Sequence, residues 1–158
     1  MANNVHTVTP KRVVIAMDGS EYSQKAFEWY VKNLHTTNDE YEPILAYCPE
    51  FGHVFGPFMT GDTNAVSEKL RKEEEEVQAV LQSLQATLDQ SGVIGRVVRL
   101  TGSPGDAICK LAEDEDADCI VTGTRGHGKL RRTILGSVSQ YVIHHAKVPV
   151  FVCRDRHK

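Results

Sequence analysis

The sequence predicts an α/β protein built on an open parallel sheet, and three observations support this fold class. Short apolar runs rich in β-branched residues alternate along the chain with longer segments of helical periodicity. Most of these runs are apolar on both faces, as in strands that helices cover on both sides. The apolar and charged fractions, 41% and 25%, suit a soluble globular protein, and 158 residues suit one domain with a sizeable core.

Five segments are predicted to be strands. They are residues 11–17 (KRVVIAM), 42–48 (EPILAYC), 94–100 (IGRVVRL), 117–123 (ADCIVTG) and 148–154 (VPVFVCR). The turn signal DGS ends the first of them. Proline in a strand favours an edge or the strand's first residue, so Pro149 indicates that the fifth segment lies at an edge of the sheet.

Four segments between the strands carry helical signals. They cover about residues 22–34, 64–90, 103–116 and 137–146. Ser20 or Ser23 is a suitable N-cap for the first, and Ser103 for the third. In the second and longest, apolar residues recur at spacings of three, four or seven, but Glu73 to Glu76 interrupt the stripe. We therefore expect the first half of that helix to be solvated.

The chain, 1–158, is expected to form one domain with a flexible tail at residues 1–10. Its elements suit two strand orders, 2-1-3-4-5 and 3-2-1-4-5, both with right-handed crossovers. Ligands of open sheets bind beyond the carboxyl ends of the strands, where the strand order reverses. The order 3-2-1-4-5 brings DGS, after the first strand, and the glycine-rich segment after the fourth into one crevice. We therefore predict a five-stranded parallel sheet of this order, with helices on both faces.

Charge and composition argue against nucleic-acid and membrane partners and indicate where in the cell the protein is expected. A net charge of −3 does not favour nucleic-acid binding. The first ten residues are polar, unlike a signal peptide, and no apolar run approaches the length of a membrane span. The scattered cysteines, with no C-x-x-C pair, suggest reduced thiols in a cytoplasmic protein.

The segment GTRGHGKL, which starts at Gly123, is close to two phosphate-binding motifs but matches neither. Leu130 stands where a P-loop has Ser or Thr, and Arg131 stands where a dinucleotide fingerprint has its last glycine. Both motifs normally follow the first strand of their unit, whereas this segment follows the fourth. We therefore reject both assignments.

A longer window, GTRGHGKLRRTILGSVSQ, has the spacing G-x2-G-x9-G-[ST], formed by Gly123, Gly126, Gly136 and Ser137. This spacing resembles that of the nucleotide-binding universal stress proteins. VVIAMDGSEYS, GSPGDAI and GSVSQYVIHHAKVPVFV resemble further parts of the family, so the resemblance covers nearly the whole chain. It implies bound ATP, a regulatory role in stress response and a homodimer through the fifth strand. Mg²⁺ would accompany the phosphates, although no protein ligand for it is evident.

The glycines and their neighbours suit a nucleotide chemically. A side chain at Gly123 would obstruct a ribose or the turn of the chain, and Gly126 lets backbone N–H groups approach a phosphate. Gly136-Ser137 opens a helix whose free N–H groups favour anions, and Ser137 and Ser139 add hydroxyl donors. Ser137 with Gln140, three residues later, equally fits a capping box, which needs no ligand.

Asp18 ends the first strand and faces the same crevice. The resemblance implies that its carboxylate binds the ribose hydroxyls, and the alternative is a turn or cap for the next helix. Tyr47 stands where the family often has a smaller apolar residue, and it either packs on adenine or crowds it. The residues expected to bind the nucleotide are Ala16, Met17, Asp18, Tyr47, Thr122, Gly123, Arg125, Gly126, Gly136, Ser137, Val138 and Ser139.

The sequence contains no evident catalytic constellation. GSVSQ lacks the nucleophile elbow G-x-S-x-G, and the adjacent His144 and His145 diverge by about 100° on a helix, which makes them a poor metal pair. We expect slow ATP hydrolysis at most. The alternative function is a dimeric stress-response interaction protein with little nucleotide binding. The phenylalanine-rich segment 49–62 is too irregular to assign.

Overall fold

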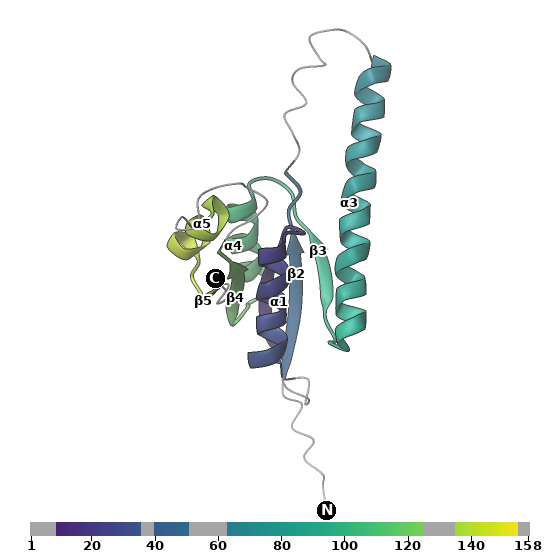
Figure 1. Ribbon diagram of the computed structural model, residues 1–158. Helices are drawn as coiled ribbons and strands as arrows, with labels where there is room; N and C mark the ends of the chain where they lie inside the picture. The colour runs from purple at the N-terminus through teal and green to yellow at the C-terminus, as the bar shows by residue number, and fades with distance from the viewer. Residues whose placement is uncertain (1–8, 36–39, 51–62, 125–134, 155–158) are drawn as a thin grey trace, which may run out of the picture.

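The computed structural model describes residues 9–35, 40–50, 63–124 and 135–154 (Figure 1). The strands are β1 (Lys11–Met17), β2 (Tyr41–Tyr47), β3 (Arg96–Arg99), β4 (Cys119–Gly123) and β5 (Val150–Cys153). The helices are α1 (Glu21–Asn33), α3 (Thr63–Ser91), α4 (Pro104–Asp114) and α5 (Ser137–His145). Each predicted strand and helix is present, with its ends moved by a few residues.

The strands form one sheet in the order β3-β2-β1-β4-β5, and every neighbouring pair is parallel. This confirms the predicted fold class and strand order. β1 lies in the middle, where Val13, Val14 and Ile15 are fully buried. The chain runs from β1 outward to β2 and β3 on one side, and β4 and β5 lie on the other, so the order reverses between β1 and β4. Ligands of such sheets bind beside that reversal.

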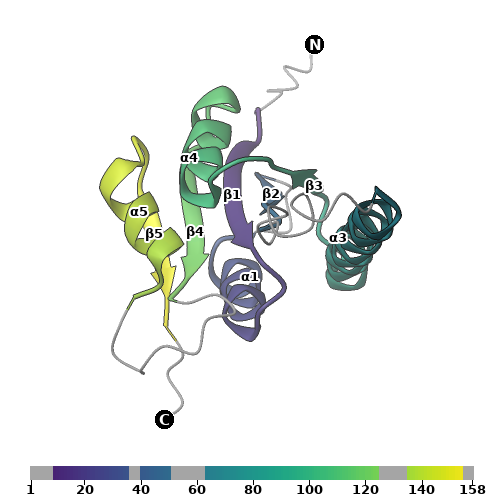
Figure 2. The same cartoon turned by 90° about the horizontal axis from the view of Figure 1, so that it is seen from above.

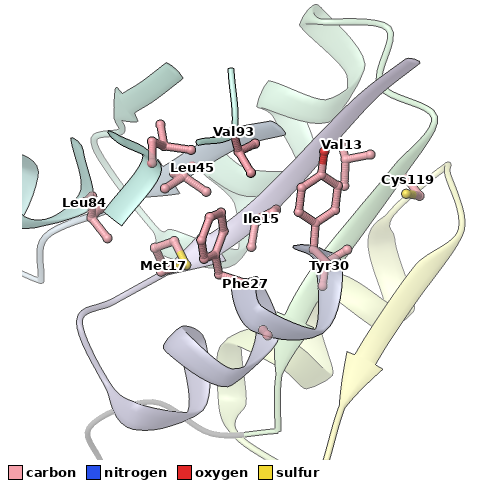
Figure 3. Close-up of a cluster of buried hydrophobic side chains, with 12 residues drawn as sticks. Val13, Ile15, Met17, Phe27, Tyr30, Leu45, Leu84, Val93 and Cys119 are labelled. Carbon is pink, nitrogen blue, oxygen red and sulfur yellow. The ribbon is translucent and has the colours of Figure 1, made fainter. Parts of the chain in front are cut away.

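Helices α1 and α3 cover one face of the sheet, and α4 and α5 cover the other (Figure 2). On the first face, Phe27 and Tyr30 of α1 and Leu84 of α3 join Ile15 and Leu45 of the strands in one buried cluster (Figure 3). Because successive side chains of a strand point to opposite faces, the neighbours of those strand residues belong to the other face.

A second buried cluster lies under α4 and α5. Ile108 of α4 and Val142 of α5 pack against Val14, Ile44 and Ile120 of the three central strands. The sheet therefore separates two apolar cores, which share no buried residue among those that the structure describes.

The start of α1 decides between the two serines that the sequence offered as caps. Ser20 is the N-cap, because its hydroxyl oxygen accepts a hydrogen bond from the Ser23 N–H at 3.2 Å. The Ser23 hydroxyl donates back to the Ser20 carbonyl at 2.9 Å. In α4, Ser103 occupies the N-cap position and Pro104 the first turn, as expected, but the Ser103 side chain makes no capping bond.

Helix α3 has 29 residues and buries only its second half. Val77, Leu84 and Leu88 are its buried residues, whereas Leu70 in the first half is 48% exposed. In Figure 1 the first half extends beyond the edge of the sheet. The interrupted apolar stripe of the sequence thus marked the solvated half correctly.

At the other end of the sheet, β5 is an edge strand and starts after Pro149. The Pro149 carbonyl accepts a hydrogen bond from the Ile120 N–H at 2.9 Å, so the proline contributes its oxygen where it has no N–H to give. All four cysteines are free thiols, three of them buried. Among the described residues, no helix is both long and apolar enough to cross a membrane.

Candidate nucleotide site at the carboxyl edge of the sheet

The candidate site lies where β1 and β4 end side by side. These strands pair in parallel with Ile15 opposite Val121, and Asp18 and Thr124 each follow three residues later. The two chain segments that leave the sheet here are the β1–α1 turn and the segment that leads to α5. The geometry therefore brings DGS and the start of the glycine-rich segment to one edge of the sheet.

One backbone hydrogen bond returns the chain to this edge before α5 begins. The Gly136 N–H donates to the Thr124 carbonyl oxygen at 2.7 Å. Gly136 is therefore held at the end of β4, although eleven residues separate it from Thr124 in the sequence. Arg125 and Gly126 were also predicted to bind the nucleotide, and both lie outside the described residues.

The first turn of α5 presents backbone N–H groups at this edge. Gly136 is the N-cap, and the first intrahelical bond runs from the Gln140 N–H to the Gly136 carbonyl at 2.9 Å. The N–H groups of Ser137, Val138 and Ser139 precede that bond, and N–H groups at this position have no partner within their own helix. No side chain caps the helix, so Ser137 and Gln140 do not form the capping box that the sequence allowed.

Ser139 is engaged inside the protein. It is 4% exposed, and its hydroxyl donates to the Gly123 carbonyl at 2.7 Å. Its oxygen also lies 3.3 Å from Oγ1 of Thr122, which is buried too. The Ser139 hydroxyl therefore ties α5 to the end of β4 and is not presented as a donor toward a phosphate. The exposed Ser137 is the hydroxyl that faces solvent at this helix start.

Asp18 forms the turn that the sequence offered as an alternative to ribose binding. Its Oδ1 accepts a hydrogen bond from the Ser20 N–H at 2.9 Å, which shapes the entry into α1. A carboxylate has two oxygens that accept about four hydrogen bonds in all. The turn and a contact to ribose are therefore compatible roles for this residue.

Gly123 is required by the fold at this point. A Cβ atom here would lie 2.7 Å from the backbone oxygen of Tyr22, in the first turn of α1. The sequence suggested that this glycine makes room for a ribose or a chain turn, whereas the structure shows close approach of a helix backbone. This neighbour is 101 positions away in the sequence, and no local signal indicates it.

The remaining predicted residues divide between the two sheet faces. Ala16 packs against the cluster under α4 and α5, whereas Met17 belongs to the cluster under α1 and α3. Tyr47 is opposite Met17 in the strand register and packs on the same cluster as Met17. The side chains of Ala16 and Met17 therefore point to opposite faces of the sheet and cannot contact the same side of a ligand. Their backbone lies at the same end of β1.

Arg99 is a neighbour of this site that sequence reasoning missed. It is opposite Tyr47 in the register, and its guanidinium donates to both carboxylate oxygens of Glu74 on α3 at 2.8 and 2.9 Å. Partial burial raises the pKa of the Tyr47 phenol, and the Arg99 charge opposes that rise. Helix propensity and strand pattern cannot predict the contact between Glu74 and Arg99, because the two residues are 25 positions apart.

Within the described ranges, no three His, Cys, Asp or Glu side chains are grouped as ligands of a metal would be. The pKa of Cys48, which is near the same edge and donates to the Gly102 carbonyl at 3.5 Å, is raised by burial. A raised pKa keeps this thiol protonated and unreactive at neutral pH.

The fold and sequence both match proteins of known type. The chain is 33% identical over 148 residues to the universal stress protein MJ0531 of Methanocaldococcus jannaschii, covering 94% of this chain and 84% of that protein. The solved structure of MJ0577 from the same organism superimposes with a TM-score of 0.71 at 25% identity, covering 94% of this chain and 98% of that one.

A universal stress protein family structure from Arabidopsis thaliana, determined with AMP bound, superimposes with a TM-score of 0.68 and covers 93% of both chains. At 20% identity this likeness supports the fold alone. The universal stress protein family model matches residues 9–154. Fold, full-length relatives and family model agree, and the chain belongs to the universal stress protein family.

Proposed function

We propose that this universal stress protein binds an adenine nucleotide, ATP, at the carboxyl edge between β1 and β4. In this proposal the nucleotide state regulates the protein's interactions during stress, and hydrolysis is slow at most. We also propose that residues 1–158 form one cytoplasmic domain. The Arabidopsis relative contains AMP, which favours an adenine nucleotide as the ligand class.

One observation carries the proposal. The 2.7 Å bond from the Gly136 N–H to the Thr124 carbonyl holds the start of α5 at the end of β4, beside the end of β1. A helix start supplies N–H donors and a positive dipole end, and both favour phosphate. The reversal of strand order at the same place is where open sheets bind their ligands.

The proposed roles follow from this geometry. The N–H groups of Ser137, Val138 and Ser139 bind the phosphates, with the exposed Ser137 hydroxyl as a further donor. Asp18 accepts hydrogen bonds from the ribose hydroxyls, and Tyr47 borders the base. The predicted contacts of Arg125 and Gly126 to phosphate complete the site.

Mg²⁺ would be held by phosphate oxygens and water, which are its usual ligands in nucleotide complexes. No described residue is assigned as a general base for attack by water on the phosphate. This is why the proposal limits hydrolysis to a slow rate.

Calorimetric titration with ATP tests the placement. Gly126→Val should weaken ATP binding by steric exclusion of a phosphate, and equal affinity in this variant and the wild type would remove Gly126 from the site. Asp18→Asn keeps an oxygen for the Ser20 N–H but loses the charge, so the fold should persist while ATP affinity falls. A hydrogen bond to a charged group contributes about 1.5–3 kcal/mol, which corresponds to a loss of roughly 10- to 150-fold.

A matched ligand separates the two roles of Asp18. 2′,3′-Dideoxy-ATP lacks the ribose hydroxyls, so wild type should bind it more weakly than ATP, and the difference between the two ligands should be smaller in Asp18→Asn, whose amide is uncharged. Equal binding of both ligands by wild type would show that Asp18 serves only the turn. Mass spectrometry of nucleotide released from the purified protein identifies the physiological ligand directly.

We further propose a homodimer in which β5 pairs with β5 of a second copy about a two-fold axis, antiparallel across that axis. Phe151 on this edge strand is 38% exposed and lies against Trp29 of α1, with ring centroids 5.4 Å apart. The exposed Phe151 and the half-buried Trp29 also suit the alternative function, a dimeric interaction protein with little nucleotide affinity. The ATP titration distinguishes the two functions.

A further inference from the structure

A second hollow adjoins the β1–α1 turn, whose residues Gly19 and Ser20 line one side of it, and it extends between the first turn of α1 and the middle of α3. Its volume is about 290 Å³. Its lining includes Met17, Gln24, Val80, Ser83, Leu84 and Thr87. Sites for small molecules typically start near this size, at about 300 Å³, so the hollow suits a compact ligand of about one ring.

The floor of the hollow is apolar. Met17 and Leu84 are 3% and 4% exposed, and both belong to the buried cluster under α1 and α3 (Figure 3). Val80 packs against the same cluster. Water on this floor finds few hydrogen-bonding partners, whereas the flat face of a ring gains contact with it. The Met17 thioether favours an aromatic ring in particular.

The rim carries neutral polar side chains, and the Ser20 hydroxyl oxygen among them accepts a hydrogen bond from the Ser23 N–H. The hydroxyls of Ser23 and Thr87 donate to the Ser20 and Ser83 carbonyls within their own helices. Among the described residues, the carboxamide of Gln24 and the hydroxyl of Ser83 make no such bond. They belong to different helices, so a ligand in the hollow can bridge α1 and α3.

No charged side chain of the described residues lines the hollow. An ion there would lose hydration without gaining a partner of opposite charge, which is costly. This separates the hollow from the proposed nucleotide site, where a triphosphate meets the N–H groups of a helix start.

We propose that this hollow binds a neutral planar heterocycle that carries a carboxamide or an equivalent donor–acceptor edge. The Gln24 carboxamide has one acceptor and two donors, so it pairs with such an edge through two hydrogen bonds. The ring lies on Met17 and Leu84, and the Ser83 hydroxyl binds from the α3 side.

Nicotinamide and nicotinate form a matched pair of probes, because they share a ring and differ in an amide against a carboxylate. Methyl-labelled methionine reports binding by NMR, with the Met17 signal assigned through Met17→Leu. Nicotinamide should shift the Met17 signal saturably, and nicotinate should bind at least about ten-fold more weakly, a difference of about 1.4 kcal/mol. Equal binding of both probes, or no shift of Met17, would overturn the proposal.

Two variants locate the probe. Ser83→Phe fills the rim and Gln24→Glu replaces the carboxamide with a charge, and each should weaken nicotinamide binding about ten-fold or more. Ser67→Phe, on the solvated half of the same helix, is the matched control and should bind as wild type does. Undiminished binding in both test variants would exclude this hollow. Saturating ATP should leave the titration unchanged, and displacement by ATP would place nicotinamide in the nucleotide site instead.

Discussion

Two serines two positions apart in α5 have opposite environments. Ser139 is buried and donates its hydroxyl to the Gly123 carbonyl, whereas Ser137 is exposed at the helix start. The sequence motif treats both as donors to phosphate. The structure assigns Ser139 to the connection between α5 and β4 and leaves Ser137 at the surface.

Ser139→Ala should therefore destabilise the fold, because it removes the 2.7 Å donor of the buried Gly123 carbonyl and leaves only the 3.2 Å bond from the Thr122 hydroxyl. Loss of one such hydrogen bond costs about 0.5–1.5 kcal/mol. Ser137→Ala should change the free energy of unfolding by no more than about 0.5 kcal/mol. Urea denaturation of both variants checks this, and equal stabilities would show that the Ser139 hydroxyl has no structural role.

The buried thiol of Cys119 and the half-buried thiol of Cys153 predict a pH dependence of stability. Burial raises the pKa of Cys119 to about 11, with a further contribution from Asp118, and burial raises the pKa of Cys153 to about 11. In the unfolded chain both thiols ionise near their ordinary pKa of 9.0. Their contribution to stability is therefore complete below pH 9 and is lost as the pH rises from 9 to 11.

A Cys119→Ala, Cys153→Ala double variant should show a shallower loss of unfolding free energy between pH 9 and 11 than wild type. Other groups titrate in this range, so the difference between the two proteins is the measured quantity. Denaturant titrations at intervals of pH check it. Parallel pH profiles for the two proteins would contradict the assignment to these thiols.

At the scale of elements, α3 combines a buried half with a solvated half. The solvated half carries ion pairs at helical spacing, such as Arg71 with Glu68 and with Glu75, and such pairs support a helix that packs on little else. The buried half contributes Leu84 and Leu88 to the core.

The two halves predict different costs for the same substitution. Leu84→Ala removes a side chain that is 4% exposed and should destabilise the protein by about 2–5 kcal/mol. Leu70→Ala, at 48% exposure on the same helix, should change stability by less than about 0.5 kcal/mol. Thermal or urea unfolding measures both, and a large loss in Leu70→Ala would reveal a partner on the solvated half.

The sequence was sufficient for elements and strand order because these depend on local patterns. Apolar runs, caps and glycine positions can be recognised within windows of about ten or twenty residues of sequence. The strand order followed from placing DGS and the glycine-rich segment in one crevice. Contacts between distant residues were not visible. Gly123 is required because the Tyr22 backbone lies against it, and the Ser139 hydroxyl binds the Gly123 carbonyl. Arg99 pairs with Glu74, a helix residue whose sequence pattern indicates only a solvated face.

At the scale of the whole molecule, the exposed edge at β5 carries the proposed dimer. Val152→Lys places a charge in that edge strand, so it should shift the protein toward monomer or reduce its solubility. Val66→Lys, on the solvated half of α3, is the control and should leave the assembly unchanged. Sedimentation velocity across a range of concentrations measures this, and a clean, soluble wild-type monomer at low concentration would refute the assembly.

The central position of β1 has a consequence for synthesis on the ribosome. The Arg12 N–H bonds the Asp118 carboxylate across 106 residues, and β4 follows immediately. Synthesis proceeds at about 5–20 residues per second, so roughly 5–20 seconds pass between the synthesis of β1 and that of β4, which pairs with its second edge. During that interval the nascent chain offers β1 as an open template for mispairing. The insertion of β4 closes that edge and adds Cys119 and Val121 to the core under α1 and α3.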